Sequence, residues 1–206
     1  MNNTEFWNKV SKGYVKSKIS DIESYQTKIE KTQEYFTKDM DVLEVGSGTG
    51  MTAVIHAPHV KHYHATDLSE GMLAFAQERI DEADLKNITL EAGAVESLSV
   101  EDGSKDVVLA MSLLHLLDDP EAGIQHIHKY LKKDGLFISS TICLGDKMNY
   151  FKPLFPLMKL VKYAPSVVHF LKKKELVSMI ENAGFKIEHD WQPGPKKAAF
   201  IVARKI

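Results

Sequence analysis

Short apolar runs of strand length alternate with segments of helical period from residue 40 onward. An uninterrupted apolar run is typical of a buried strand, and apolar residues three or four positions apart are typical of an amphipathic helix. Strands that alternate with helices pair in parallel, so we expect a sheet covered on both faces. The predicted strands span residues 41–45, 60–66, 88–91, 107–111 and 136–142, and the predicted helices span residues 51–57, 120–131 and 173–183, with one more beginning after Ser69.

The C-terminal segment departs from this alternation. Gly184 ends a helix, and two strand-like runs follow, over residues 185–191 and 198–203. The loop between them, residues 192–197, contains Pro-Gly-Pro and has no room for a helix, so these two strands are expected to be antiparallel. We therefore predict an α/β fold: a Rossmann-like, doubly wound, seven-stranded and mostly parallel sheet with a C-terminal antiparallel hairpin.

Residues 1–39 precede the first strand and carry two helical patterns. We expect them to form a helical cap that packs on the sheet, within a single domain spanning residues 1–206. The second pattern has apolar residues at helical spacing: Ile22, Tyr25, Ile29 and Phe36.

Charge and cysteine content narrow the class of protein. The chain has 26 Lys+Arg against 28 Asp+Glu, a net charge of −2, so we expect no nucleic-acid partner. Cys143 is the single cysteine, which excludes an internal disulfide and a cysteine-based zinc site. No signal peptide and no apolar run of about 18 residues is present, so a cytoplasmic location is expected.

A glycine-rich turn follows the first predicted strand, with Gly46, Gly48 and Gly50. Such glycines let a ligand approach the backbone, and the next helix offers free N–H groups. Met51 stands where a phosphate-binding loop needs Lys and where the dinucleotide fingerprint needs its third glycine. Asp67 ends the second strand, where a carboxylate can accept the hydroxyls of an adenosine ribose. The residues disfavour a nucleoside triphosphate and leave NAD as a second choice.

Together with three further motifs, this pattern resembles the class I S-adenosylmethionine-dependent methyltransferases, specifically the small-molecule branch that includes ubiquinone and menaquinone C-methyltransferases. The resemblance covers residues 40–206. It implies S-adenosylmethionine as cofactor, S-adenosylhomocysteine as product, and a small apolar or aromatic methyl acceptor that is similar to a quinone precursor or is another metabolite. The five motifs are residues 42–50, 67–69 with Met72, 93–98, 113–116 and 130–135.

The resemblance also implies which residues bind the cofactor. Asp67 would hold the ribose, Leu68 and Met72 would enclose the adenine, and Val95 would offer its backbone N–H to the ring. Glu44 would lie near the methionine ammonium. The full set is Glu44, Gly46, Ser47, Gly48, Gly50, Asp67, Leu68, Met72, Ala94, Val95, Glu96 and Met111.

One position departs from the family pattern. Many relatives have an acid that bonds the adenine amino group where this chain has Ala94, so either Glu96 substitutes or the cofactor affinity is lower. Two alternatives to a methyltransferase stay open. One is an NAD-dependent oxidoreductase, which Met51 and the terminal hairpin disfavour, and the other is a non-catalytic S-adenosylmethionine-binding protein, which Ala94 permits.

Acceptor residues are expected in the cap and in the insertion over residues 143–171. His115 is the titratable side chain that the motif places near the fourth strand, where it is either a general base or a structural histidine. The insertion is apolar and basic, so it is a lid over the acceptor, a cap on the sheet or a peripheral membrane contact. The candidates are Tyr14, Tyr25, His115, Phe151 and Phe155.

We predict no metal site. Four histidines lie close in sequence, but no cysteine or paired acid completes a ligand set, so solvated side chains are expected. The expected partner is a small, possibly lipophilic acceptor, and the expected assembly is a monomer or a weak homodimer. The four histidines are His56, His59, His62 and His64.

Overall fold

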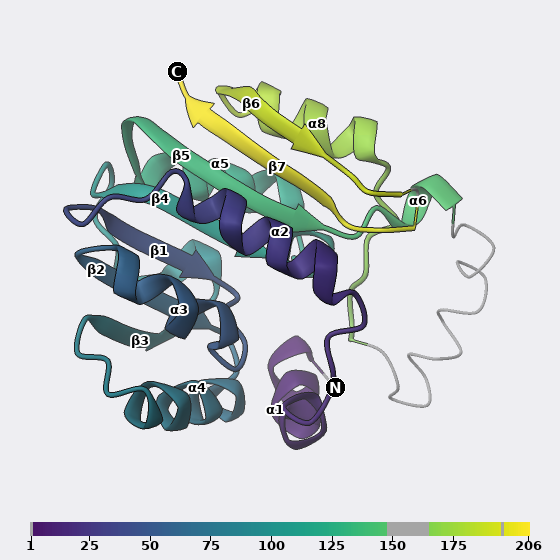
Figure 1. Cartoon of the computed structure of the whole chain (residues 1–206). Coiled ribbons are helices and arrows are strands. Elements are labelled where there is room, and N and C mark those ends of the chain that lie inside the picture. Colours follow the sequence, from purple (N-terminus) through teal and green to yellow (C-terminus); the bar gives the residue numbers. More distant parts are fainter. Residues whose placement is uncertain (1, 148–164, 195) are drawn as a thin grey trace.

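A seven-stranded sheet forms the centre of the molecule, in the order β3-β2-β1-β4-β5-β7-β6 (Figure 1). The computed structural model describes residues 2–147, 165–194 and 196–206. Strands β1 to β5 run parallel, and β7 runs antiparallel to both β5 and β6, which confirms the predicted fold class. The strands are β1 Asp41–Val45, β2 His62–Asp67, β3 Ile88–Ala92, β4 Lys105–Met111, β5 Leu131–Thr141, β6 Phe185–Trp191 and β7 Ala199–Lys205.

Four strands begin elsewhere than predicted: β4 begins two residues earlier, β7 begins one residue later, and β2 and β5 also differ. β2 begins at His62, because Val60 is still held by the preceding turn, where its N–H donates to the Ala57 carbonyl. β5 begins five residues earlier than expected, because Leu131 already pairs with Lys105 before the register shifts at Val107. The apolar pattern marks only the buried part of a strand, so it misses paired residues that stay polar.

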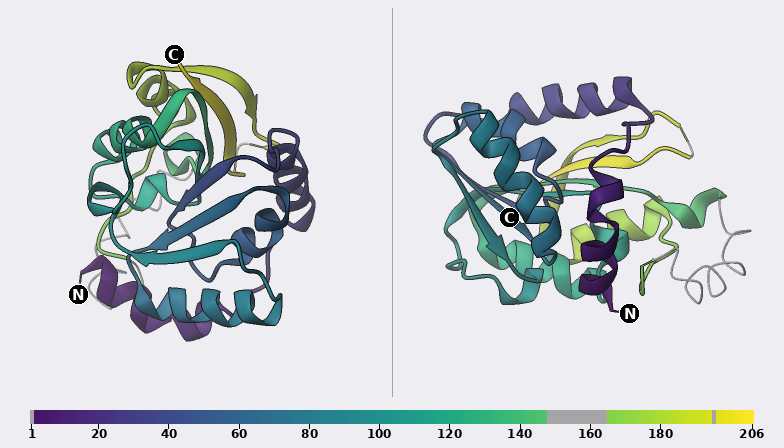
Figure 2. Two further views of the ribbon diagram at one scale, coloured as in Figure 1. Left: turned by 90° about the vertical axis from the view of Figure 1, so that its left-hand side faces the viewer. Right: turned by 90° about the horizontal axis from the view of Figure 1, so that it is seen from below.

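Helices cover both faces of the sheet, with α2 and α3 on one face and α5 and α8 on the other (Figure 2). Helix α4 lies along the β3 edge with α1 beside it. No helix among the described residues is long and apolar enough to cross a membrane. The helices are α1 Asn3–Tyr14, α2 Ile22–Gln33, α3 Met51–His56, α4 Glu70–Glu82, α5 Pro120–Tyr130, α6 Leu144–Lys147 and α8 Lys173–Asn182, with 3₁₀ turns η1 Ala57–His59, η2 Val95–Ser97 and η3 Leu114–Leu116.

The sheet separates two apolar cores. Neighbouring residues of a strand point to opposite faces, so Val42 and Ile138 belong to the core beneath α3, whereas Leu43 and Phe137 belong to the core beneath α5 and α8. All four side chains have no exposed surface. Because both faces are buried, β1 and β4 read as continuous apolar runs, which is why the sequence pattern located them.

Helix α1 is fastened to the start of α4. The Asn8 side-chain oxygen accepts hydrogen bonds from the Ser69 hydroxyl at 2.7 Å and from the Gly71 N–H at 2.9 Å. Ser69 is the N-cap of α4, as predicted, and its hydroxyl accepts from the Met72 N–H. The first cap helix is therefore attached to the turn that follows β2, next to Asp67.

Helix α2 lies over the sheet and reaches the end of β5. The Lys28 ammonium donates to the Ser140 hydroxyl at 2.9 Å. Of the four apolar residues at helical spacing, Ile22 is the first residue of α2 and its side chain is 65% exposed. Helix α2 ends at Gln33, and Phe36 packs beyond it, edge-on against His56.

Candidate active site

The order of the strands reverses between β1 and β4, and the glycine-rich turn follows β1 at this point. In open α/β sheets, ligands bind at such a reversal, beyond the carboxyl ends of the strands. Gly46, Gly48 and Gly50 all have positive φ, at 69°, 55° and 71°. Only glycine adopts this conformation without strain, so the turn depends on all three.

The three glycines differ in their surroundings. A Cβ on Gly46 would lie 2.7 Å from Leu113 Cδ1, and one on Gly50 would lie 2.8 Å from Ala76 Cβ. A Cβ on Gly48 would meet nothing within 4 Å. Gly46 and Gly50 thus allow close packing of neighbouring elements, whereas the space beside Gly48 is open to a ligand.

Asp67 at the end of β2 is held toward this turn by two backbone groups. Its two carboxylate oxygens accept one hydrogen bond each, from the Gly48 N–H and from the Ser69 N–H, both at 2.9 Å. Burial raises the pKa of the carboxyl, and the two N–H donors oppose this shift. A carboxylate has about four acceptor positions, so two remain for a ligand.

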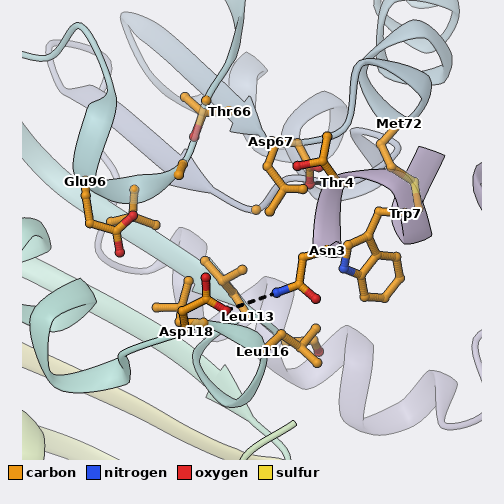
Figure 3. A pocket seen from close by; sticks show the side chains of 18 of the residues that line it. Asn3, Thr4, Trp7, Thr66, Asp67, Met72, Glu96, Leu113, Leu116 and Asp118 are labelled. Atoms are coloured by element: carbon orange, nitrogen blue, oxygen red, sulfur yellow. Dashed lines mark hydrogen bonds between the residues drawn. The ribbon is translucent and has the colours of Figure 1, made fainter. Parts of the chain in front are cut away.

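A cavity of about 510 Å³ opens beside Asp67, and we call it the acidic cavity (Figure 3). Among the described residues that line it, every charged side chain is an acid. This volume lies within the range of small-molecule sites. The four acids are Asp67, Glu96, Asp118 and Asp119.

Helix α1 completes the wall of the acidic cavity with Asn3, Thr4 and Trp7 (Figure 3). The Asn3 side-chain oxygen accepts from both the N–H and the hydroxyl of Ser166, at 3.0 and 2.5 Å, and its amide donates to Asp118 at 3.4 Å. Sequence reasoning missed these residues. Their only signal was a polar and aromatic N-terminus in a segment expected to act as a cap.

A second cavity of about 620 Å³ lies on the other side of the glycine turn, beneath α2, and we call it the lysine cavity. Sequence reasoning did not find it. Its described charged residues are Lys18, Lys28, Lys196 and Lys197, with the acids Asp21 and Glu44. Lys197 forms an ion pair with Asp21 at 2.7 Å, and this pair lowers the pKa of Asp21 to about 2.

Glu44 lines the lysine cavity from within β1 and is 1% exposed. It accepts a hydrogen bond from the Tyr63 hydroxyl at 2.9 Å. Burial raises the pKa of Glu44 to about 7, while the Tyr63 bond lowers it and the nearby Asp67 raises it further. A buried carboxyl with this pKa is poised to ionise when a cationic group binds beside it.

The two cavities meet at a shared wall. Ser112 follows β4 and is a non-glycine residue with a φ of 61°. Its N–H donates to the Ser140 carbonyl at 2.7 Å, which fixes the end of β4 to the end of β5. Strained residues of this kind concentrate at functional sites. The shared wall consists of Tyr14, Gly46, Gly48, Met111 and Ser112.

Most of the sequence-predicted cofactor residues line one or both cavities. Ser47 lines the lysine cavity with Glu44, and its buried hydroxyl has no hydrogen-bond partner among the described residues. Gly50 lines neither cavity among the described residues, because it packs on α4. The acidic cavity takes in Gly46, Gly48, Asp67, Leu68, Met72, Ala94, Val95, Glu96 and Met111.

The predicted acceptor residues are dispersed. Tyr14 lies in the shared wall and Tyr25 lines the lysine cavity. Phe151 and Phe155 lie outside the described residues. His115 is 7% exposed, and among the described residues it belongs to neither lining. Burial is the main cause that lowers the pKa of His115 to about 4, so the imidazole is neutral at pH 7.

The four clustered histidines do not share one environment. The expectation of solvated side chains is wrong for His56, which has no exposed surface and packs against Phe36. Burial lowers its pKa to about 4. His64 bonds Glu91 at 3.0 Å. Over the described ranges of the chain, no three His, Cys, Asp or Glu side chains are grouped as a metal site would need.

The acidic cavity suits an adenosyl sulfonium ligand. Such a ligand carries a sulfonium charge beside its adenosyl group, and a cavity with acids as its only described charges favours a positive group. Asp67 has acceptor positions left for ribose hydroxyls, and Gly48 leaves room for a ligand against the backbone. The residues present therefore fit S-adenosylmethionine.

Comparison with known proteins supports this fit. Residues 42–135 match the family model described as a methyltransferase domain. The methyltransferase YcgJ of Bacillus subtilis is 29% identical over 97 residues, which are 47% of this chain and 38% of that protein. The 2-methyl-6-phytyl-1,4-hydroquinone methyltransferase of Arabidopsis thaliana is 28% identical over 159 residues, 77% of this chain and 44% of that protein. The chain thus spans less than half the length of these curated relatives.

A solved structure extends the comparison to the whole fold. The S-adenosylmethionine-dependent methyltransferase from Thermotoga maritima superposes with a TM-score of 0.72 and covers 99% of both chains. The sequences are 18% identical, so this similarity concerns the fold alone.

Proposed function

We propose that the protein is a class I, S-adenosylmethionine-dependent methyltransferase that transfers the cofactor's methyl group to a small acceptor; the match of residues 42–135 to the model of a methyltransferase domain supports this. The observation that carries the proposal is the acidic cavity, where Asp67 is held beside the glycine turn at the strand reversal. The comparisons give no support to the oxidoreductase alternative.

Each end of the cofactor has candidate partners in this arrangement. Asp67 holds the ribose hydroxyls, and Leu68 and Met72 enclose the adenine within the acidic cavity. Glu44 accepts the ammonium from the lysine-cavity side of the glycine turn. Gly48 lines both cavities, so the methionyl chain passes along it from one to the other.

When bound, S-adenosylmethionine would supply an activated methyl group, which the acceptor's nucleophile attacks in line while S-adenosylhomocysteine leaves. The protein therefore has to position the acceptor and exclude water more than to activate either reactant. The shared wall is the place for this, since a ligand there is within reach of both cavities. The name of the Arabidopsis relative, a hydroquinone methyltransferase, supports an aromatic acceptor.

His115 is the candidate acceptor of the proton that leaves the nucleophile. Its ring is neutral at pH 7, and its Nδ1 has no hydrogen-bond partner among the described residues. Burial, which lowers its pKa to about 4, opposes uptake of the proton and makes it a weak base. A base role predicts that His115→Ala lowers turnover by about a hundredfold while the cofactor affinity changes less than twofold. Equal turnover with a lower melting temperature would show a packing role instead.

The proposed function is tested by labelling. The protein is incubated with S-adenosylmethionine that carries a labelled methyl group and with an extract of small metabolites and lipids. We expect one small species to gain the label, with S-adenosylhomocysteine formed in equal amount. Binding of S-adenosylmethionine without any labelled product would favour a non-catalytic binding protein, and binding of NADH in its place would contradict the proposal.

A further inference from the structure

We propose that the methyl acceptor carries an anionic oxygen group, a carboxylate or a phosphate, which binds to Lys28 in the lysine cavity. The inference rests on the proposed function and names the substrate class of the same site. It starts from the difference in charge between the two cavities. Among the described residues, the charged side chains of the acidic cavity are all acids, whereas the lysine cavity has four lysines and two acids.

The acids of the lysine cavity do not neutralise its lysines. Asp21 is engaged by Lys197, and Glu44 is buried with a pKa of about 7, so it is only partly ionised at neutral pH. The remaining lysines, Lys18, Lys28 and Lys196, have no ion pair among the described residues. The cavity therefore has an excess of positive charge that favours an anion.

Lys28 is the lysine placed to act inside the cavity rather than at its rim. Its side chain is half-buried, whereas Lys18 and Lys196 are exposed. Its ammonium donates to the neutral Ser140 hydroxyl at 2.9 Å, which fixes its position and leaves two further N–H donors. Burial lowers the pKa of Lys28, and Asp21, which stabilises its charge, only partly opposes this shift because Asp21 is paired with Lys197. An anionic ligand in direct contact with the ammonium would relieve the remaining cost.

The bonds around Lys28 connect it to the reaction centre. Ser140, which Lys28 bonds through the hydroxyl, accepts the Ser112 N–H at its carbonyl. Ser112 belongs to the wall shared with the acidic cavity. An anion on Lys28 would therefore leave the rest of the acceptor beside the shared wall, where the methyl group is delivered.

The body of the acceptor is expected to be apolar or aromatic. Besides its charged residues, the lysine cavity is lined by apolar and aromatic side chains, which suit a ring or a short hydrocarbon chain. An anionic head with an apolar body also agrees with the aromatic acceptor proposed above. These side chains are Tyr25, Ile29, Met51, Met111 and Ile142.

The cofactor's own carboxylate is a second source of the same anionic chemistry, and the test distinguishes the two. Fluorine NMR measures binding of para-fluorobenzoate, para-fluorophenyl phosphate, para-fluorobenzyl alcohol and para-fluorobenzylamine to the full chain saturated with S-adenosylhomocysteine. We expect one of the two anions to bind at least about tenfold more tightly than the alcohol or the amine.

Three variants test whether Lys28 causes the tighter binding of the anion. Lys28→Met should weaken binding of the anion by about tenfold or more and leave the affinity for S-adenosylhomocysteine within twofold. Lys28→Arg should retain most of the anion binding. Lys31→Met is the matched control, because Lys31 lies one turn further along α2, outside the cavity lining, and pairs with Glu34. It should change neither affinity.

Each contrary result has a distinct meaning. Equal binding of the alcohol or the amine, or unchanged anion binding in Lys28→Met, would overturn the anionic acceptor. A tenfold loss of S-adenosylhomocysteine affinity in Lys28→Met would assign Lys28 to the cofactor's carboxylate and would also overturn it, with the proposed function intact. If the wild-type chain does not bind S-adenosylhomocysteine, the proposed function fails, and the same titration without it still decides the anion site.

Discussion

The acidic cavity and the lysine cavity share a wall but differ in charge and in origin. The acids of the acidic cavity come from the end of β2, from η2 and from the turn before α5. The lysines of the lysine cavity come from α2, from the segment before α2 and from the loop between β6 and β7. A cationic donor and an anionic acceptor would each find a matching surface, with their reacting ends at the shared wall. The contrast in charge is therefore the first reason to propose a donor half and an acceptor half of the site.

The largest expected effect concerns the glycine turn between the cavities. Gly50→Ala should destabilise the protein by about 3 kcal/mol, because it adds a Cβ 2.8 Å from Ala76 Cβ at a positive φ. Gly48→Ala has the same backbone strain but open space, so it should cost about 1–2 kcal/mol and weaken cofactor binding instead. Urea unfolding and cofactor titration of both variants measure this difference. Similar stability losses in the two variants would contradict the assignment of Gly50 to packing.

The second largest effect tests whether Asp67 binds the cofactor in the acidic cavity. Asp67→Asn keeps an oxygen that can accept one of the two backbone N–H groups but removes the charge, so S-adenosylhomocysteine should bind about thirtyfold more weakly. The melting temperature of the free protein reports whether the fold survives. Unchanged affinity would remove Asp67 from the ribose site.

Glu44 should make the affinity for the cofactor depend on pH. Its pKa of about 7 lies above the usual 4.5, so the carboxyl ionises between pH 6 and 8 in the free protein. A bound ammonium favours the ionised form, so the cofactor affinity should rise by about tenfold from pH 6 to pH 8. Titrations at several pH values check this, and Glu44→Gln should bind with nearly constant affinity.

The same group has a defined effect on stability. Because burial raises the pKa of Glu44 in the fold, the folded state is favoured most below pH 4.5, and this contribution is lost as the pH rises through 7. Relative to wild type, Glu44→Gln should therefore be more stable at pH 8 than at pH 4.5 when no cofactor is bound. Urea unfolding of both proteins at the two pH values measures this difference in stability. A larger relative stability of Glu44→Gln at pH 4.5 than at pH 8 would contradict the burial of a neutral carboxyl.

The smallest expected effect separates the rim of the lysine cavity from its interior. Lys196 is exposed at the rim, so Lys196→Met should weaken binding of para-fluorobenzoate by only about two- to threefold. Salt screens exposed charges, so this difference should disappear at about 1 M salt, whereas the effect of Lys28→Met should persist. Equal salt dependence of the two variants would contradict the distinction.

The fold was predictable because its strands are buried on both faces. The sequences of β1 and β4 are apolar runs, and the short Pro-Gly-Pro loop predicted that β6 and β7 are antiparallel. At β2, the apolar and buried Val60 belongs to the preceding turn and not to the strand. At β5, the missed residues that follow Leu131 belong to the strand although their side chains are polar or exposed. Backbone pairing of such residues leaves no hydrophobic signal in the sequence.

The acidic cavity was partly predictable and the lysine cavity was not. Gly48 and Asp67 lie 19 residues apart at the ends of consecutive strands, so their proximity follows from strand order. Lys28 and Lys196 are far apart in the sequence and come together only because β7 inserts between β5 and β6. The contribution of α1 likewise depends on Asn3 and Asn8, whose bonding partners are set by tertiary packing.

Calorimetric titration of S-adenosylhomocysteine into the wild-type, Asp67→Asn and Lys28→Met proteins tests the division of the site most directly. We predict a loss of affinity of about thirtyfold for Asp67→Asn and a change of less than twofold for Lys28→Met. A comparable loss in both variants would show that Lys28 binds the cofactor and would contradict its assignment to the acceptor.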